Sequence, residues 1–125
     1  MPRTHSALPT TPTVLVVDDE PDLREIVAVL LEEEGYAVKQ APDGVAALQE
    51  IEAEGIDLIV TDVRMPRLDG ASLIQRLRKR GITTPVVVMS GTHTAVDVPG
   101  VRFLPKPFTP DHLLTAIETA LANRA

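Results

Sequence analysis

The chain has 125 residues, the size of a single folded domain, and 44% of them are hydrophobic, a share that excludes disorder of the whole chain. Its formal net charge of −6 argues against direct binding to nucleic acid, because the phosphate backbone carries the same sign of charge. The absence of cysteine and an aromatic share of only 2% exclude disulfide frameworks, thiolate zinc sites and base-stacking surfaces. No apolar run approaches the ~20 residues of a membrane span, and no apolar signal core follows the N-terminus. We therefore expect a cytoplasmic protein that does not bind membranes.

Residues 1–12 are rich in Pro, Thr and Ser and show no hydrophobic periodicity, which predicts a flexible N-terminal arm. The folded domain is expected over residues 13–125. Within it, short apolar runs of strand length alternate with amphipathic stretches of helical periodicity. The five predicted strands span residues 14–17, 36–41, 56–61, 86–89 and 101–104.

Four amphipathic stretches are predicted to be helices, because a capping residue or a proline begins each of them and a glycine follows three of them. The predicted starts are Pro21, Asp43, Asp69 or Ser72, and Thr109 followed by Pro110, and the glycines are Gly35, Gly55 and Gly81. The first helix has an apolar stripe that is expected to face the core. This stripe consists of Leu23, Ile26, Val27, Leu30 and Leu31.

The alternation of strands and helices is typical of a parallel sheet covered by helices. The first, third and fourth runs are almost wholly apolar, as central strands must be, whereas the second and fifth contain Lys39, Gln40 and Arg102. We therefore predict an α/β fold, a flavodoxin-like doubly wound five-stranded parallel sheet of order 2-1-3-4-5. Only ten residues, 91–100, separate the fourth run from the fifth, and a helical crossover needs at least about 10–12. The helix expected there, helix 4 of this fold, should be shortened or missing.

Polar residues follow the predicted strands at the points where they end. Asp18 and Asp19 follow the first strand, Asp62 the third, Ser90 the fourth and Lys106 the fifth. Because the carboxyl ends of parallel strands share one rim, where such folds bind ligands, these side chains are expected to meet. Three ionised carboxylates repel one another without a cation, and ligation by oxygen alone favours Mg²⁺ over Zn²⁺. With Mg²⁺ bound, Asp62 is suited to attack phosphorus and form an acyl phosphate, assisted by the charge of Lys106 and the hydroxyl of Ser90.

From about residue 14 to residue 121 the sequence resembles the receiver domain of two-component response regulators. The motifs that carry the resemblance are VVDDE at 16–20, DVRMPRLDG at 62–70, MSG at 89–91 and KPF at 106–108. The resemblance implies that a histidine kinase or a histidine phosphotransfer protein phosphorylates Asp62. A change of conformation would then regulate a downstream protein that the sequence does not identify.

The resemblance also assigns individual residues. It implies that Mg²⁺ is held by Asp18, Asp19, Asp62 and the backbone carbonyl of Arg64. Ser90 and Phe103 would be the hydroxyl and aromatic members of the switch, and the Lys106–Pro107 peptide bond is expected to be cis. A receiver domain is a phosphoacceptor rather than an enzyme, with at most self-phosphorylation and autodephosphorylation.

Three other interpretations fit less well. A haloacid-dehalogenase-like phosphatase needs a second acid two residues after its nucleophile, where this chain has Arg64. A flavodoxin-like cofactor binder needs a phosphate loop rich in Ser, Thr and Gly, whereas residues 18–22 are acidic except for Pro21. A receiver that has lost phosphorylation is disfavoured because all five rim residues are present.

The sequence leaves the cognate kinase, the downstream target, the pathway and the phosphoryl lifetime open. It is compatible with a stand-alone regulator and with a receiver that belongs to a larger protein such as a hybrid kinase. We expect a monomer or a weak dimer, because the dimerising surface of typical receivers includes the helix expected to be short here. The phosphoryl lifetime is expected to reflect Arg64 and Thr92, with Arg64 shielding the phosphoryl group and slowing its hydrolysis. His93 is expected to be an exposed loop residue.

Overall fold

The computed structural model describes residues 11–53, 55–65, 67–91 and 99–123. In this part of the chain, five parallel strands form one sheet of order β2-β1-β3-β4-β5, as predicted. The strands are β1 (Thr13–Val17), β2 (Ala37–Ala41), β3 (Leu58–Asp62), β4 (Val86–Ser90) and β5 (Val101–Pro105). Most of the predicted N-terminal arm lies outside the described residues, although the carbonyl of Pro12 accepts a hydrogen bond from the Ala37 N–H at 3.0 Å.

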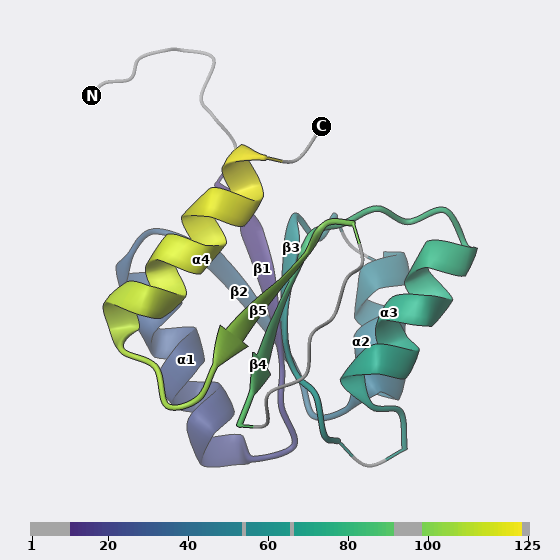
Figure 1. Ribbon diagram of the computed structural model, residues 1–125, viewed down its shortest axis with the longest axis horizontal. Coiled ribbons are helices and arrows are strands. Elements are labelled where there is room, and N and C mark those ends of the chain that lie inside the picture. Colours follow the sequence, from purple (N-terminus) through teal and green to yellow (C-terminus); the bar gives the residue numbers. More distant parts are fainter. Residues whose placement is uncertain (1–10, 54, 66, 92–98, 124–125) are drawn as a thin grey trace.

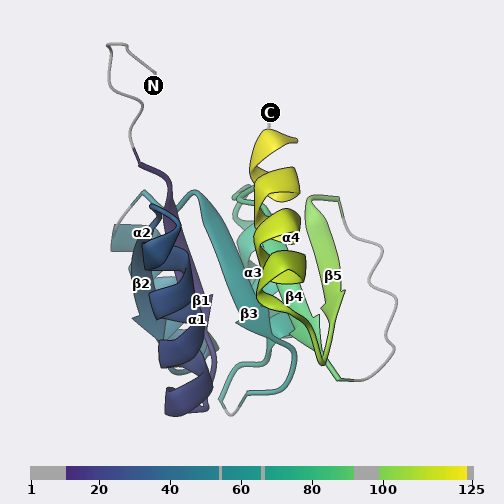
Figure 2. The same cartoon turned by 90° about the vertical axis from the view of Figure 1, so that its left-hand side faces the viewer.

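Helices cover both faces of the sheet (Figures 1 and 2). α1 (Pro21–Glu33) and α4 (Pro110–Ala122) lie on one face, and α2 (Gly44–Ala53) and α3 (Gly70–Lys79) lie on the other. Each face therefore has its own hydrophobic core. Val14 and Val16 belong to one core and Leu15 and Val17 to the other, because successive side chains of a strand point to opposite faces.

The helix starts follow from local capping. Asp69 Oδ1 accepts a hydrogen bond from the Ser72 N–H at 2.8 Å, so Asp69 rather than Ser72 is the N-cap of α3. Asp43 Oδ1 accepts from the Ala46 N–H at 2.9 Å at the start of α2. Thr109 caps α4 as predicted.

One residue of the predicted core stripe of α1 is not in the core. Ile26 is 64% exposed, whereas Val27, Ala28 and Leu31 are buried against the sheet. The reason lies in the neighbouring helix, because α4 packs on the same face with Leu113 in the core and leaves a hollow beside α1. Ile26 lines that hollow instead of the core.

The connection from β4 to β5 spans residues 91–100. Its described residues, Gly91, Pro99 and Gly100, are not helical, and the described part of the chain contains four helices, which fits the prediction of a shortened or missing helix. The expectations for Thr92 and His93 fall on 92–98, outside the described residues. None of the helices in the described ranges has the length and hydropathy needed to cross a bilayer.

The sheet order creates the place where a site can form. β1 pairs with β2 on one side and with β3 on the other, so the chain leaves β1 in one direction and β3 in the opposite direction. Crevices at such a reversal, beyond the carboxyl ends of the strands, are the usual ligand sites of doubly wound sheets. Asp18 directly follows β1, and Asp62 is the last residue of β3.

Candidate functional site

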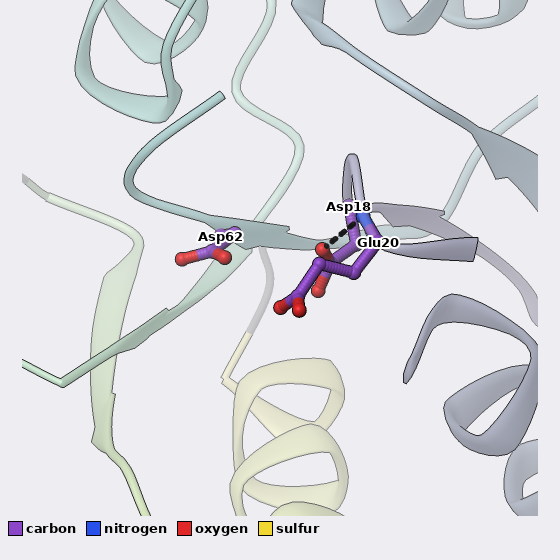
Figure 3. A group of neighbouring side chains, drawn as sticks. All are labelled: Asp18, Glu20 and Asp62. Atoms are coloured by element: carbon purple, nitrogen blue, oxygen red, sulfur yellow. Dashed lines mark hydrogen bonds between the residues drawn. The ribbon is translucent and has the colours of Figure 1, made fainter. Parts of the chain in front are cut away.

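Three acidic side chains meet at the carboxyl ends of β1 and β3 (Figure 3). Asp18 and Glu20 come from the turn after β1, and Asp62 comes from the end of β3. Carboxylate oxygens of the three lie within 4.8 Å of one another. The two strands are hydrogen-bonded neighbours, which is why residues so distant in sequence come together.

Asp18 is fully buried. Its Oδ1 accepts a hydrogen bond from the Glu20 N–H at 2.9 Å, and its own N–H donates to the Ala41 carbonyl at 3.1 Å. Its Oδ2 has no hydrogen-bond partner among the described residues. Burial, together with the negative charges of Asp62 and Glu20, raises the pKa of the Asp18 carboxyl.

Asp62 is only 9% exposed and is held from two directions. Its Oδ1 accepts from the Val63 N–H at 2.7 Å, and its Oδ2 lies 3.2 Å from Lys106 Nζ. Lys106 is aimed by the turn after β5, where its N–H donates to the Ser90 carbonyl at 2.7 Å. The Lys106–Pro107 peptide bond is cis, as expected from the sequence.

The remaining sequence-predicted residues lie on β4 and β5. Ser90 ends β4 and is buried, and the preceding residue, Met89, is opposite Asp62 in the register of β3 and β4. The structure therefore brings Ser90 to the rim of the site. Phe103 lies on the edge strand β5, partly exposed and opposite Val88.

The structure differs from the expected metal ligands at one position. Asp19 is exposed and does not belong to the acidic group, whereas Glu20, which the sequence analysis did not single out, does. Glu20 is the N-cap residue of α1, and its N–H bonds back to Asp18, so the turn carries its side chain toward the site. The sequence signal that could have identified Glu20 is its place as the third consecutive acid at the end of the VVDDE motif. The ligand roles of Asp19 and of the carbonyl of Arg64, an exposed loop residue, stay predictions.

The loop after Asp62 is held close to the strand that precedes it. The Gly70 N–H donates to the Val63 carbonyl at 2.9 Å, and a Cβ at position 70 would lie 2.5 Å from the carbonyl oxygen of Asp62, so only glycine fits. Arg67, whose φ is 71°, pairs with the buried Asp43 at 3.4 Å. The close approach of Gly70 to the Asp62 carbonyl explains why the DVRMPRLDG segment ends in glycine.

The donor set fits a hard divalent cation. All the donors in the group are carboxylate oxygens, the ligands that Mg²⁺ prefers. The buried Oδ2 of Asp18 lacks a partner among the described residues, and such an oxygen costs free energy unless a donor or a cation satisfies it. Asp18, Glu20 and Asp62 are therefore suited to bind Mg²⁺.

Comparison with known proteins gives consistent matches. The family model of the response regulator receiver domain matches residues 14–118. Response regulator MprA of Mycobacterium ulcerans is 37% identical over 114 residues, which cover 86% of this chain and 49% of MprA. This chain thus spans about half the length of that curated relative.

Solved structures agree with the sequence comparison. Chemotaxis protein CheY4 of Vibrio cholerae has a TM-score of 0.81 and 30% identity, with 90% of this chain and 100% of CheY4 covered. Response regulator protein TrrA of Thermotoga maritima, solved in complex with Mg²⁺-BeF, has a TM-score of 0.81 and 29% identity, with 89% of this chain and 100% of TrrA covered. With the sheet order, the acidic rim and the family model in agreement, this chain belongs to the family of response regulator receiver domains.

Proposed function

We propose that this chain accepts a phosphoryl group on Asp62 from the phosphohistidine of a histidine kinase or a histidine phosphotransfer protein. The observation that supports this most directly is the position of Asp62, nearly buried between Lys106 at 3.2 Å and the acidic residues Asp18 and Glu20. An ion pair alone would fit a carboxylate with only a structural role. The Asp62 carboxylate is paired with Lys106 and also adjoins a group of acids suited to bind a metal.

The proposed cation is Mg²⁺, held by Asp18 and Asp62. The backbone carbonyl of Arg64 completes the proposed ligands, together with Asp19 as the resemblance implies or Glu20 as the geometry favours. When bound, Mg²⁺ would screen the repulsion between the Asp62 carboxylate and the oxygens of the incoming phosphoryl group. The complex of TrrA with Mg²⁺-BeF supports this choice of cation.

In the proposed reaction, Asp62 is the nucleophile. One of its oxygens bonds to phosphorus while the P–N bond of the phosphohistidine breaks, and the electron pair of that bond stays on the imidazole nitrogen. The Lys106 ammonium, already next to Asp62, balances the added negative charge. The Ser90 hydroxyl is proposed to move toward the phosphoryl group and donate a hydrogen bond to one of its oxygens. This movement at the end of β4 is proposed to reposition Phe103 on the neighbouring β5.

The donor protein must approach Asp62 across the rim of the sheet, and an apolar hollow of about 550 Å³ lies there between α1 and the start of α4. Its lining residues are Leu23, Ile26, Val27, Leu30, Lys106, Pro107, Phe108, Pro110 and Leu113. We propose that a helix of the phosphodonor docks in this hollow. Lys106 both lines the hollow and contacts Asp62, so a donor seated there would have its histidine close to the acceptor.

The phosphoacceptor is tested with acetyl phosphate and Mg²⁺, followed by intact-protein mass spectrometry. The wild-type chain is expected to gain one phosphoryl group, and Asp62→Asn is expected to gain none, because an amide does not form an acyl phosphate. Asp69→Asn is the matched control, since it removes a carboxylate from the same loop while asparagine still caps α3. Labelling of Asp62→Asn at the wild-type rate would contradict the proposal.

We also propose that Arg64, exposed two residues after Asp62, limits the access of water to the aspartyl phosphate and slows autodephosphorylation. Hydrolysis needs a water in line with the P–O bond. The long Arg64 side chain can block that water, and its guanidinium, which stays protonated, cannot activate the water as a base. Thr92, the second residue expected to have this role, lies outside the described residues.

A further inference from the structure

Arg24, in the first turn of α1, reaches back to the turn that carries the acidic residues. Its Nη1 donates to the main-chain carbonyl of Asp18 at 2.7 Å, the short distance of a charge-assisted hydrogen bond. Its Nε donates to Gln40 Oε1 at 3.1 Å, and Gln40 Nε2 donates to Glu25 Oε1 at 3.2 Å. The guanidinium therefore joins the end of β1 to the edge strand β2.

This bond completes the set of contacts that hold Asp18. The N–H of Asp18 donates to the Ala41 carbonyl, its carbonyl accepts from Arg24, and its Oδ1 accepts from the Glu20 N–H, the bond drawn as a dashed line in Figure 3. Only Oδ2 has no partner among the described residues. The residue is thus fixed on the backbone and on one carboxylate oxygen, which leaves the other oxygen in a set position for a cation.

Arg24 acts on the main chain rather than on the carboxylates. Among the described residues, the Arg24 side chain donates to the Asp18 carbonyl and to Gln40 Oε1, and neither acceptor is a carboxylate oxygen. Removal of this side chain would therefore break the hydrogen bond to the Asp18 main chain without removing a partner of a carboxylate in the site.

We propose that Arg24 is a positioning residue of the cation site, which holds the carbonyl of Asp18 and thereby sets the carboxylate geometry that Mg²⁺ requires. Mg²⁺ demands nearly ideal octahedral geometry, so a mobile turn lowers its affinity. Partners that orient the ligands of a metal typically contribute about 10–100-fold in affinity. The inference rests on the proposed function only for the identity of the cation.

The test is Mg²⁺ binding in the absence of any phosphodonor, measured by calorimetry and by Mg²⁺-induced amide shifts of residues 17–20. Arg24→Ala is expected to weaken Mg²⁺ binding by about 10-fold or more. Gln40→Ala, which keeps the Asp18 bond, is expected to cause a much smaller loss. Arg24→Lys, which retains one donor, is expected to recover part of the affinity.

Two controls distinguish a positioning role of Arg24 from an effect of net charge and from a loss of stability of the fold. Arg76→Ala removes an exposed arginine from α3, on the opposite face of the sheet, and should leave Mg²⁺ affinity unchanged. Thermal denaturation without Mg²⁺ reports the structural contribution of Arg24. Arg24→Met keeps the apolar stem without the donors and repeats the test if the alanine variant does not fold.

Unchanged Mg²⁺ affinity in a folded Arg24→Ala or Arg24→Met variant would overturn the inference, even if the variant were less stable. An equal loss in Arg76→Ala would also overturn it, because the cause would then be net charge. If the wild-type chain binds Mg²⁺ but Asp62 is not labelled by acetyl phosphate, the proposed function fails while the role of Arg24 in binding stands. If the wild-type chain binds no Mg²⁺, the inference about Arg24 is wrong.

Discussion

At the scale of single residues, two acids of the site, Asp18 and Asp62, are buried. Asp18 is fully buried, and burial raises the pKa of its carboxyl. An Asp with a raised pKa binds its proton more tightly in the folded state than in the unfolded state, so its ionisation as the pH rises reduces stability. Lys106 offsets part of this charge through Asp62. The buried carboxylate therefore lowers the stability of the fold and at the same time provides an acidic site suited to bind a cation.

Asp18→Asn is therefore expected to raise the free energy of unfolding in Mg²⁺-free buffer by on the order of 1 kcal/mol. Its Oδ1 can still accept from the Glu20 N–H, while the buried charge is removed. The variant is also expected to lose the stabilisation that the wild-type chain gains from Mg²⁺ binding. Urea denaturation with and without Mg²⁺ measures both effects.

Asp22→Asn is the control for this experiment. Asp22 is exposed in the first turn of α1, so its substitution should leave the Mg²⁺-dependent gain in stability intact. An Asp18→Asn variant that is less stable than the wild-type chain without Mg²⁺ would contradict this account of the buried charge.

At the scale of elements, α1 and α4 do not close completely over their face of the sheet. Two large hydrophobic residues of α1 are exposed, Ile26 at 64% and Val29 at 41%, and of these only Ile26 lines the hollow beside Lys106. Exposed apolar side chains at a concave surface are typical of a protein interface. Substitution of Ile26 therefore tests docking in the hollow, and the same substitution at Val29 serves as its control.

Ile26→Asp is expected to slow phosphotransfer from the cognate phosphorylated kinase by about 10-fold or more, since loss of a central hot-spot contact costs about 2 kcal/mol or more. Labelling by acetyl phosphate, which needs no docking, should be unchanged. Val29→Asp introduces the same charge on the same helix outside the hollow and should transfer normally. The donor is first identified by profiling the kinases of the source organism, and equal losses in both variants would place the docking surface elsewhere.

At the scale of the whole molecule, the connection between β4 and β5 is short for a helical crossover. The connection has ten residues, 91–100, and its described end residues are not helical. Arg78 of α3 bonds to this connection at the Pro99 carbonyl, 3.4 Å away. A dimer surface that depends on a long helix at this position is therefore not expected.

We predict that the chain is a monomer, or a weak dimer through another face, both alone and with Mg²⁺ and beryllofluoride. Light scattering coupled to size-exclusion chromatography measures the oligomeric state, and crosslinking identifies the face. The net charge of −6 adds repulsion between copies. A beryllofluoride-dependent dimer with crosslinks in β5 or in residues 91–100 would show that the prediction is wrong.

The sequence alone determined the architecture and most of the rim of the site. Central parallel strands are buried on both faces, so β1, β3 and β4 appear as continuous apolar runs, and the polar residues in the edge strands give the sheet order. Asp18, Asp62, Ser90 and Lys106 were predictable as a group because the carboxyl ends of parallel strands lie at one rim. The cap of α4 was predictable because capping bonds are local, whereas for α3 the sequence left Asp69 and Ser72 as alternatives.

Only the tertiary structure decided how the side chains beyond the strand ends are directed. Glu20 rather than Asp19 approaches Asp62 because the turn is held by the Glu20 N–H and by Arg24, contacts that hydrophobic periodicity does not encode. Ile26 is exposed because the packing of α4 beside α1 leaves a hollow, although its spacing matches that of core residues. Strand order follows from which residues must avoid water, whereas these directions follow from specific hydrogen bonds in the turn after β1 and from the packing of α4 beside α1.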